Sequence, residues 1–81
     1  MNVEEKLKNI FCNLFFLKME EVHDKLSQGD VNSWDSLQHL NLILAIEEEF
    51  GIVISPEEAT EMLNFGLVVL LIKEKLKTAA P

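Results

Sequence analysis

The sequence contains no arginine and no tyrosine, and it has only one cysteine, two prolines and three glycines. A single cysteine cannot form an internal disulfide, so the fold must depend on packing, which suits a reducing, cytoplasmic compartment. All seven lysines lie outside residues 26–72, a stretch that carries eight of the fourteen acidic residues. Because nucleic-acid phosphates need lysine or arginine, this distribution argues against nucleic-acid binding and favours a basic protein partner.

The sequence also lacks a long apolar run and a basic leader. Its longest apolar run, Leu67–Ile72, is far shorter than the roughly 20 residues that span a bilayer. The first residues, Met1–Glu5, are acidic where a secretory leader would be basic. We therefore expect no membrane association and a cytoplasmic location. With 81 residues, of which 48% are hydrophobic, the chain is expected to form one small domain over residues 1–81.

Apolar residues recur at helical spacing in the first part of the chain and predict a helix over about residues 3–17. The residues that carry this pattern are Val3, Leu7, Ile10, Leu14 and Leu17. A polar connection over residues 18–35 follows. It is long for a helix–helix connection in a small bundle, and long connections are often functional.

The second helix is expected over residues 36–50 because both of its ends carry signals. Asp35 is a good N-cap, and Gln38 stands where it can complete a capping box. Gly51 can adopt the left-handed conformation that ends a helix.

The third and fourth helices begin with equally clear signals. Ser55, Pro56 and Glu58 form a capping box with proline in the first turn, which predicts a short helix ending near Leu63. Asn64 can cap a last helix that runs to about residue 77. No stretch alternates with period two for long. The fold class is therefore expected to be all-α, a small four-helix bundle of three longer helices and a short third one.

The second helix has two apolar faces when its residues advance about 100° each. The larger face is assigned to the core and comprises His39, Leu42, Ile43, Ile46 and Phe50. The opposite face comprises Leu37, Leu40 and Leu44, edged by Asn41, Glu47 and Glu48. Either the long connection covers these leucines, through Val31 or Trp34, or they form a docking surface with an apolar centre and an acidic rim.

Ser36 stands at the N-terminal end of this helix, beside the outer leucines. Free N–H groups and a partial positive charge at a helix N-terminus would stabilise a phosphodiester on the serine oxygen. The plainer reading is that Ser36 merely helps to start the helix.

The segment Trp34-Asp35-Ser36-Leu37, followed by Glu47-Glu48-Glu49-Phe50-Gly51 and by Ile54–Ala59, resembles the acyl carrier protein family. The resemblance covers the whole chain in order and spacing and is strongest from residue 34 to residue 62. It implies that Ser36 receives 4′-phosphopantetheine from coenzyme A through a separate, magnesium-dependent phosphopantetheinyl transferase. It also implies that this transferase reads Asp35 and Leu37, and that the chain has no catalytic activity of its own.

The same resemblance implies a partner surface and a place for the cargo. The expected partner-binding residues are Leu40, Asn41, Leu44, Glu47 and Glu48. Their partners would be enzymes with basic docking patches that load or transfer acyl or aminoacyl groups, and the carrier would be a monomer. A fatty cargo would fold back among Ile46, Phe50, Ile54, Ala59, Met62, Leu63 and Ile72, unless these residues form only an ordinary packed core.

Three features depart from the commonest form of that family. Trp34 replaces a small residue, Asn41 occupies a position that is often acidic, and Leu67–Ile72 lacks the usual acidic and aromatic residues. A dedicated pathway carrier is therefore as well supported as a general fatty-acid carrier. Two competing hypotheses are an aminoacyl carrier of the peptide-synthetase or D-alanyl type, and an unmodified acidic helical adaptor that would not need Ser36.

The remaining reactive side chains favour structural roles. Cys12 lies among phenylalanines and is expected to be a small packed residue, His39 a packed or hydrogen-bonded one, and His23 a solvated one. The three show no zinc-ligand spacing. A triad of Ser36, His39 and Asp35 lacks the preorganised geometry and the oxyanion hole that such catalysis needs.

Overall fold

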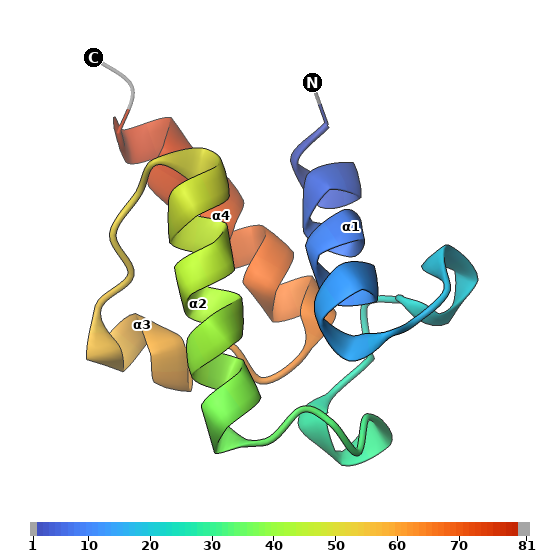
Figure 1. Ribbon diagram of the computed structural model, residues 1–81. Coiled ribbons are helices and arrows are strands. Elements are labelled where there is room, and N and C mark those ends of the chain that lie inside the picture. Colours follow the sequence, from blue (N-terminus) through green and yellow to red (C-terminus); the bar gives the residue numbers. More distant parts are fainter. Residues whose placement is uncertain (1, 80–81) are drawn as a thin grey trace.

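The computed structural model of the chain describes residues 2–79, and the side chains of residues 2–77. Within this part of the chain there are four α-helices and no strand: α1 (Val3–Phe15), α2 (Ser36–Phe50), α3 (Pro56–Thr60) and α4 (Phe65–Ala79). Two short 3-10 turns, Met19–Glu21 and Gln28–Asp30, interrupt the long connection between α1 and α2. Figure 1 shows the short α3 beside the N-terminal half of α2. The all-α bundle with a short third helix is therefore confirmed.

Two helices end earlier than the sequence predicted. The first stops at Phe15, because Phe16 takes the left-handed conformation (φ 58°) and its N–H donates to the Cys12 carbonyl. The third stops at Thr60 and not near Leu63, because the Glu61 N–H bonds back to Glu58 and the chain then turns so that Met62 is buried. The last helix runs on to Ala79, past the expected end at residue 77.

The ends of α2 follow the predicted signals except at one side chain. The Asp35 carboxylate accepts the Gln38 N–H at 2.9 Å, and Gly51 ends the helix with φ 65°. The predicted capping box is wrong, however, since the Gln38 amide Nε2 donates to the Leu14 carbonyl at 3.3 Å. That carbonyl lies in the last turn of α1, where it has no partner within its own helix and needs a donor from elsewhere.

The short α3 and the start of α4 are capped as predicted. The Ser55 hydroxyl accepts the Glu58 N–H at 3.1 Å, and the Glu58 carboxylate accepts the Ser55 N–H at 2.9 Å. The Asn64 side chain accepts the Leu67 N–H at 2.8 Å. These bonds satisfy donors that a helix N-terminus otherwise leaves without partners.

The core is one continuous cluster of buried side chains centred on an aromatic group. The ring of Phe11 meets those of Phe15, Trp34 and Phe65 edge-on, with centroids 5.5, 5.3 and 5.0 Å apart. The long connection also contributes buried side chains to this cluster, namely Val22, Leu26, Val31 and Trp34. Edge-to-face aromatic pairs add to the free energy gained by burying apolar area. The connection is thus part of the core.

Backbone contacts hold this connection against the start of α4. The Phe65 N–H donates to the Leu26 carbonyl at 2.9 Å, and the Gly66 N–H donates to the Asp24 carbonyl at 2.8 Å. A Cβ atom at position 66 would lie 3.0 Å from the Asp24 carbonyl oxygen, so this close approach depends on glycine. Over residues 2–79, no helix combines the length and the apolar character needed to cross a bilayer.

Candidate functional site

Ser36 is the first residue of α2 and its side chain is exposed to solvent. Its hydroxyl makes no hydrogen bond to any other described residue. It borders a hollow of about 260 Å³, whose lining residues are Gln28, Ser36, His39, Ala59, Thr60, Met62 and Leu63. The serine oxygen is therefore free to be modified, next to a recess between the start of α2 and the end of α3.

His39 fixes the shape of this recess. The Trp34 Nε1–H donates to the His39 Nδ1 at 3.0 Å, and the two rings are stacked. The other nitrogen, Nε2, lies 3.0 Å from the Ala59 carbonyl oxygen. Because Nδ1 accepts this hydrogen bond and so carries no hydrogen, Nε2 must carry the hydrogen of the neutral ring and donate it to that carbonyl. The expected hydrogen-bonded role of His39 is confirmed, and through it α2 is joined to both Trp34 and α3.

The polar neighbours of Ser36 hold the local structure. The Asp35 carboxylate caps the helix through the Gln38 N–H, and both nitrogens of His39 are engaged. Since a general base needs a free acceptor within reach of the proton that it removes, His39 cannot serve as a base for Ser36 while these bonds hold.

The outer face of α2, which we define as Leu37, Leu40, Asn41, Leu44 and Glu48, is open to solvent. The three leucines have exposed fractions of 67%, 59% and 62%. Trp34 and Val31 are themselves buried in the core, so neither covers them. The predicted exposure of this face is confirmed. Exposed apolar clusters of this kind with a charged rim mark interaction surfaces.

Glu47 differs from the other acidic residues of α2. It is only partly exposed, and its carboxylate accepts the backbone N–H of Ile54 at 2.8 Å. This bond ties the segment between α2 and α3 to the last turn of α2. The side chain of Glu47 therefore has a structural role as well as a place beside the outer face.

The residues expected to surround a folded-back cargo divide into two groups. Ile46, Ile54, Met62 and Ile72 are buried in the core, and Phe50 and Ala59 pack partly against it. Leu63 is 59% exposed and lies outside the core. The cargo role of this set stays a prediction.

The pKa values of two side chains, Cys12 and Glu58, differ from their ordinary values. Burial is the main cause that raises the pKa of the Cys12 thiol, and the negative charge of Glu21 is the second. The thiol is half-buried, and its sulfur lies 3.5 Å from the sulfur of Met19. A raised pKa makes the thiol less reactive. The pKa of Glu58 is lowered mainly by the hydrogen bond that Lys75 donates to its carboxylate at 2.8 Å, and next by the bond from the backbone N–H of Ser55. The Glu58–Lys75 pair thereby joins α3 to α4.

Gln28 and Thr60 border the recess beside Ser36, and the sequence did not predict them. Gln28 donates from its side chain to the Trp34 carbonyl at 3.3 Å, which holds the long connection near the start of α2. Thr60 lies at the recess because the His39–Ala59 hydrogen bond holds the end of α3 beside α2. Neither position carries a local sequence signal, since each depends on a contact between distant segments.

No family model matches this chain. It is 44% identical over 61 residues to an acyl carrier protein of Buchnera aphidicola subsp. Schizaphis graminum, covering 75% of this chain and 77% of that protein. It is 37% identical over 75 residues to an acyl carrier protein of Nitratidesulfovibrio vulgaris, covering 93% and 99%. The solution structure of a holo acyl carrier protein from Nitrosomonas europaea superposes with a TM-score of 0.81 at 24% identity, covering 95% and 99%.

An exposed serine at the head of an acidic, leucine-rich helix is the arrangement of a carrier protein. The identities and coverages of the curated relatives make the assignment specific: the chain belongs to the acyl carrier protein family. Membership of this family supports 4′-phosphopantetheine as its cofactor. Its partners accordingly include a phosphopantetheinyl transferase and enzymes that handle acyl groups.

Proposed function

We propose that this chain acts as a single carrier domain that holds acyl intermediates as thioesters on a 4′-phosphopantetheine arm attached to Ser36. It would present them to enzymes of a fatty-acid, lipid or polyketide-type pathway. The observation that carries the proposal is the placement of Ser36: an exposed, unbonded hydroxyl on the first residue of α2, beside an open recess and the outer face.

The surroundings of Ser36 fit a phosphodiester. The first turn of α2 directs backbone N–H groups toward this end of the helix, and the helix dipole favours negative charge there. The first turn of α2 itself contains no acidic residue that would repel a phosphate, and the Asp35 carboxylate is occupied by its cap bond. In the transfer the Ser36 oxygen would displace adenosine 3′,5′-bisphosphate from coenzyme A. The transferase would take up the serine proton, because both nitrogens of His39 are already bonded.

The outer face of α2 would bind the partner enzymes. The leucines would enter an apolar patch on the partner, and Glu48 would pair with a lysine or arginine at its rim. Residues 26–72 contain eight acidic residues and no lysine, so this part of the surface attracts basic proteins over a distance. Glu47 would contribute less, since its carboxylate already holds the Ile54 N–H.

The competing aminoacyl carrier rests on Trp34 before the Asp35-Ser36 pair. In the structure the Trp34 ring packs against Phe11 and Phe15 and donates to His39. Core packing therefore accounts for the tryptophan, and this position gives no preference for an aminoacyl cargo.

The proposal is tested by intact mass after incubation with coenzyme A, magnesium and a broad-specificity phosphopantetheinyl transferase. The natural chain and a Ser33→Ala control should each gain one phosphopantetheine group, and Ser36→Ala should gain none. An unchanged mass in folded natural protein, with an active carrier modified in the same tube, would favour the unmodified adaptor.

The docking role is tested by a matched pair of charge reversals. Glu48→Lys should raise the transferase KM severalfold at low salt, whereas Glu20→Lys, an exposed acid away from α2, should leave it nearly unchanged. Added salt should shrink the difference, because it screens exposed charges. Equal effects from both variants would mean that net charge, and not this face, governs the encounter.

A further inference from the structure

A small apolar hollow lies on the surface between α1 and α2. The residues that line it are Ile10, Asn13, Leu14 and Ala45, of which only Asn13 is polar. Its volume is about 260 Å³, below the roughly 300–1,000 Å³ of sites that hold small ligands. The three apolar residues are partly exposed, so part of their surface remains in contact with water. A hollow of this size and chemistry suits a single apolar side chain.

Two polar links join α1 to α2 near the ends of this hollow. At one end the Gln38 amide donates to the Leu14 carbonyl at 3.3 Å, and at the other the Lys6 ammonium lies 3.1 Å from the Glu49 carboxylate. Lys6, Ile10 and Leu14 follow one another four residues apart and therefore share one side of α1. The hollow is thus preformed between two linked ends, and a side chain that enters it does not have to open it.

The hollow adjoins the outer face of α2. Since helical residues advance about 100° each, Asn41 lies about 40° and Ala45 about 80° around α2 from Leu37. The Asn41 amide Nδ2 donates to the Gln38 Oε1 at 2.7 Å, which fixes the edge between the exposed leucines and the hollow. An ionised carboxylate at position 41 has no hydrogen to donate and could not make this bond. The outer face and the hollow therefore form one surface that spans two helices.

The charge at the edge of this surface is negative. Glu48 is exposed on the outer face, one turn after Leu44. Lys6, beside the hollow, is already paired with Glu49, which offsets its charge. A partner that matches this surface carries an apolar side chain for the hollow and a lysine or arginine for Glu48.

We infer that the phosphopantetheinyl transferase that docks on the outer face of α2 also places one apolar side chain in the hollow between α1 and α2. This inference rests on the proposed function and extends its docking surface to α1, through Ile10, Asn13 and Leu14. It gives the neutral Asn41 a role, since its bond to Gln38 holds the edge that the outer face and the hollow share.

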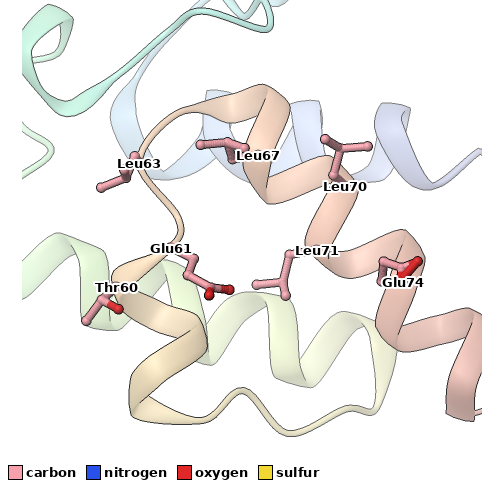
Figure 2. A pocket seen from close by; sticks show the side chains of 7 residues that line it. All are labelled: Thr60, Glu61, Leu63, Leu67, Leu70, Leu71 and Glu74. Carbon is pink, nitrogen blue, oxygen red and sulfur yellow. The ribbon is translucent and has the colours of Figure 1, made fainter.

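The experiment titrates the methyl-labelled, unmodified chain with unlabelled transferase. Coenzyme A is left out, so that the two proteins bind without reacting. The methyl signals of Ile10 and Leu14 report on the hollow, and those of Leu44 report on the outer face. Leu70 is the reference, because it is as exposed as Leu44, at 62%, but lines a groove between α3 and α4. Figure 2 shows this groove, whose lining includes no residue of α1 or α2.

Two substitutions at Asn13 are compared with the same two at Asn9. Both asparagines are exposed on α1, and only Asn13 lines the hollow. Asn13→Lys should raise the Kd of the transferase severalfold, because a charge in the wall disfavours an apolar group and repels basic neighbours. Asn13→Leu should not raise the Kd, since it extends the apolar wall. Asn9→Lys and Asn9→Leu should leave the Kd nearly unchanged. Leucine and lysine both favour helix, so all four variants should fold.

In the natural chain, the signals of Ile10, Leu14 and Leu44 should shift or broaden together, while those of Leu70 stay unchanged. Shifts at Leu44 without shifts at Ile10 and Leu14, shifts at none of these residues, or equal shifts at Leu70 would overturn this inference. Equal effects of lysine at positions 9 and 13 would also overturn it.

Coenzyme A and magnesium are then added to the same samples, and intact mass shows whether the chain is modified. A modified chain whose Ile10 and Leu14 signals had not changed would overturn this inference and leave the carrier function standing. A natural chain that stays unmodified would overturn the proposed function and this inference with it.

Discussion

The two sides of the bundle are held together in different ways. On one side, α1, Trp34 and the start of α4 pack around the buried ring of Phe11, with three other aromatic rings against it. On the other side, α3 has no buried residue and is attached by polar contacts. These contacts are the His39–Ala59 hydrogen bond, the Glu58–Lys75 ion pair, and the Glu47–Ile54 bond just before α3.

This difference separates the part of the molecule that supplies stability from the part that carries the site. Buried apolar area provides most of the free energy of folding, whereas a single hydrogen bond or ion pair contributes much less. Ser36 and its recess adjoin α3, because Ala59 and Thr60 line the recess together with Ser36. Elements with few buried contacts open locally at lower free energy than the rest of a fold. The site therefore adjoins an element that can shift while the aromatic side stays intact.

The largest loss of stability is expected from Phe11→Ala on the aromatic side. Phe11 is fully buried, so the substitution leaves a cavity and should lower the free energy of unfolding by about 3–5 kcal/mol. Urea denaturation measures the loss. Phe16→Ala is the control, because the Phe16 side chain is 88% exposed and its removal should change stability by about 0.5 kcal/mol or less. Similar losses from both variants would contradict the assigned core.

On the α3 side, His39→Leu should have the next largest effect. It leaves the Trp34 Nε1–H and the Ala59 carbonyl without their partner and should lower the free energy of unfolding by about 1–3 kcal/mol. Amide hydrogen exchange should accelerate more over residues 56–60 than around Phe11. His23→Leu, at an exposed position, is the control. Uniform acceleration over the whole chain would show that the two sides are not energetically distinct.

The left-handed residues at two helix ends give a pair of opposite effects. Phe16 adopts φ 58° and Gly51 adopts φ 65°, a conformation that costs a bulky residue roughly 1–2 kcal/mol. Phe16→Gly should therefore raise the free energy of unfolding by about 1 kcal/mol, and Gly51→Ala should lower it by about the same amount. A loss of stability in Phe16→Gly would mean that the exposed ring makes a stabilising contact.

The smallest effect is expected from the partly exposed Glu58–Lys75 pair, and it should depend on pH. Since folding lowers the pKa of Glu58, the unfolded chain binds more protons on acidification. The stability from the pair is complete above the ordinary glutamate pKa of about 4.3 and declines as the pH falls through the lower folded value. The stability difference between the natural chain and Glu58→Gln should therefore shrink between about pH 7 and about pH 3. If the stability difference stayed constant with pH, the contribution of Glu58 would come from its capping hydrogen bond and not from its charge.

Local patterns predicted most of the fold. Apolar spacing and the caps at Asp35, Gly51, Ser55 and Asn64 depend on residues a few positions apart, and all four caps form. The outward position of Leu37, Leu40 and Leu44 follows from helix geometry in the same way.

What the sequence did not predict depends on contacts between distant segments. The Gln38 side chain does not bond back to the Asp35 N–H, because its amide donates to the Leu14 carbonyl, 24 positions earlier. The early end of α3 follows from the burial of Met62. Thr60 lies beside Ser36 only because His39 holds the end of α3.

The central claim, a carrier arm on Ser36, is tested most directly by fragmenting the modified protein. The chain has no arginine and no lysine between residues 26 and 72, so trypsin should release residues 26–73 as one peptide that contains Ser27, Ser33, Ser36 and Ser55. After incubation with coenzyme A and the transferase, the fragment ions that end at Asp35 and those that begin at Leu37 should both lack the added mass. The added mass would then be assigned to Ser36. An unmodified peptide, or an added mass on Ser27, Ser33 or Ser55, would contradict the account.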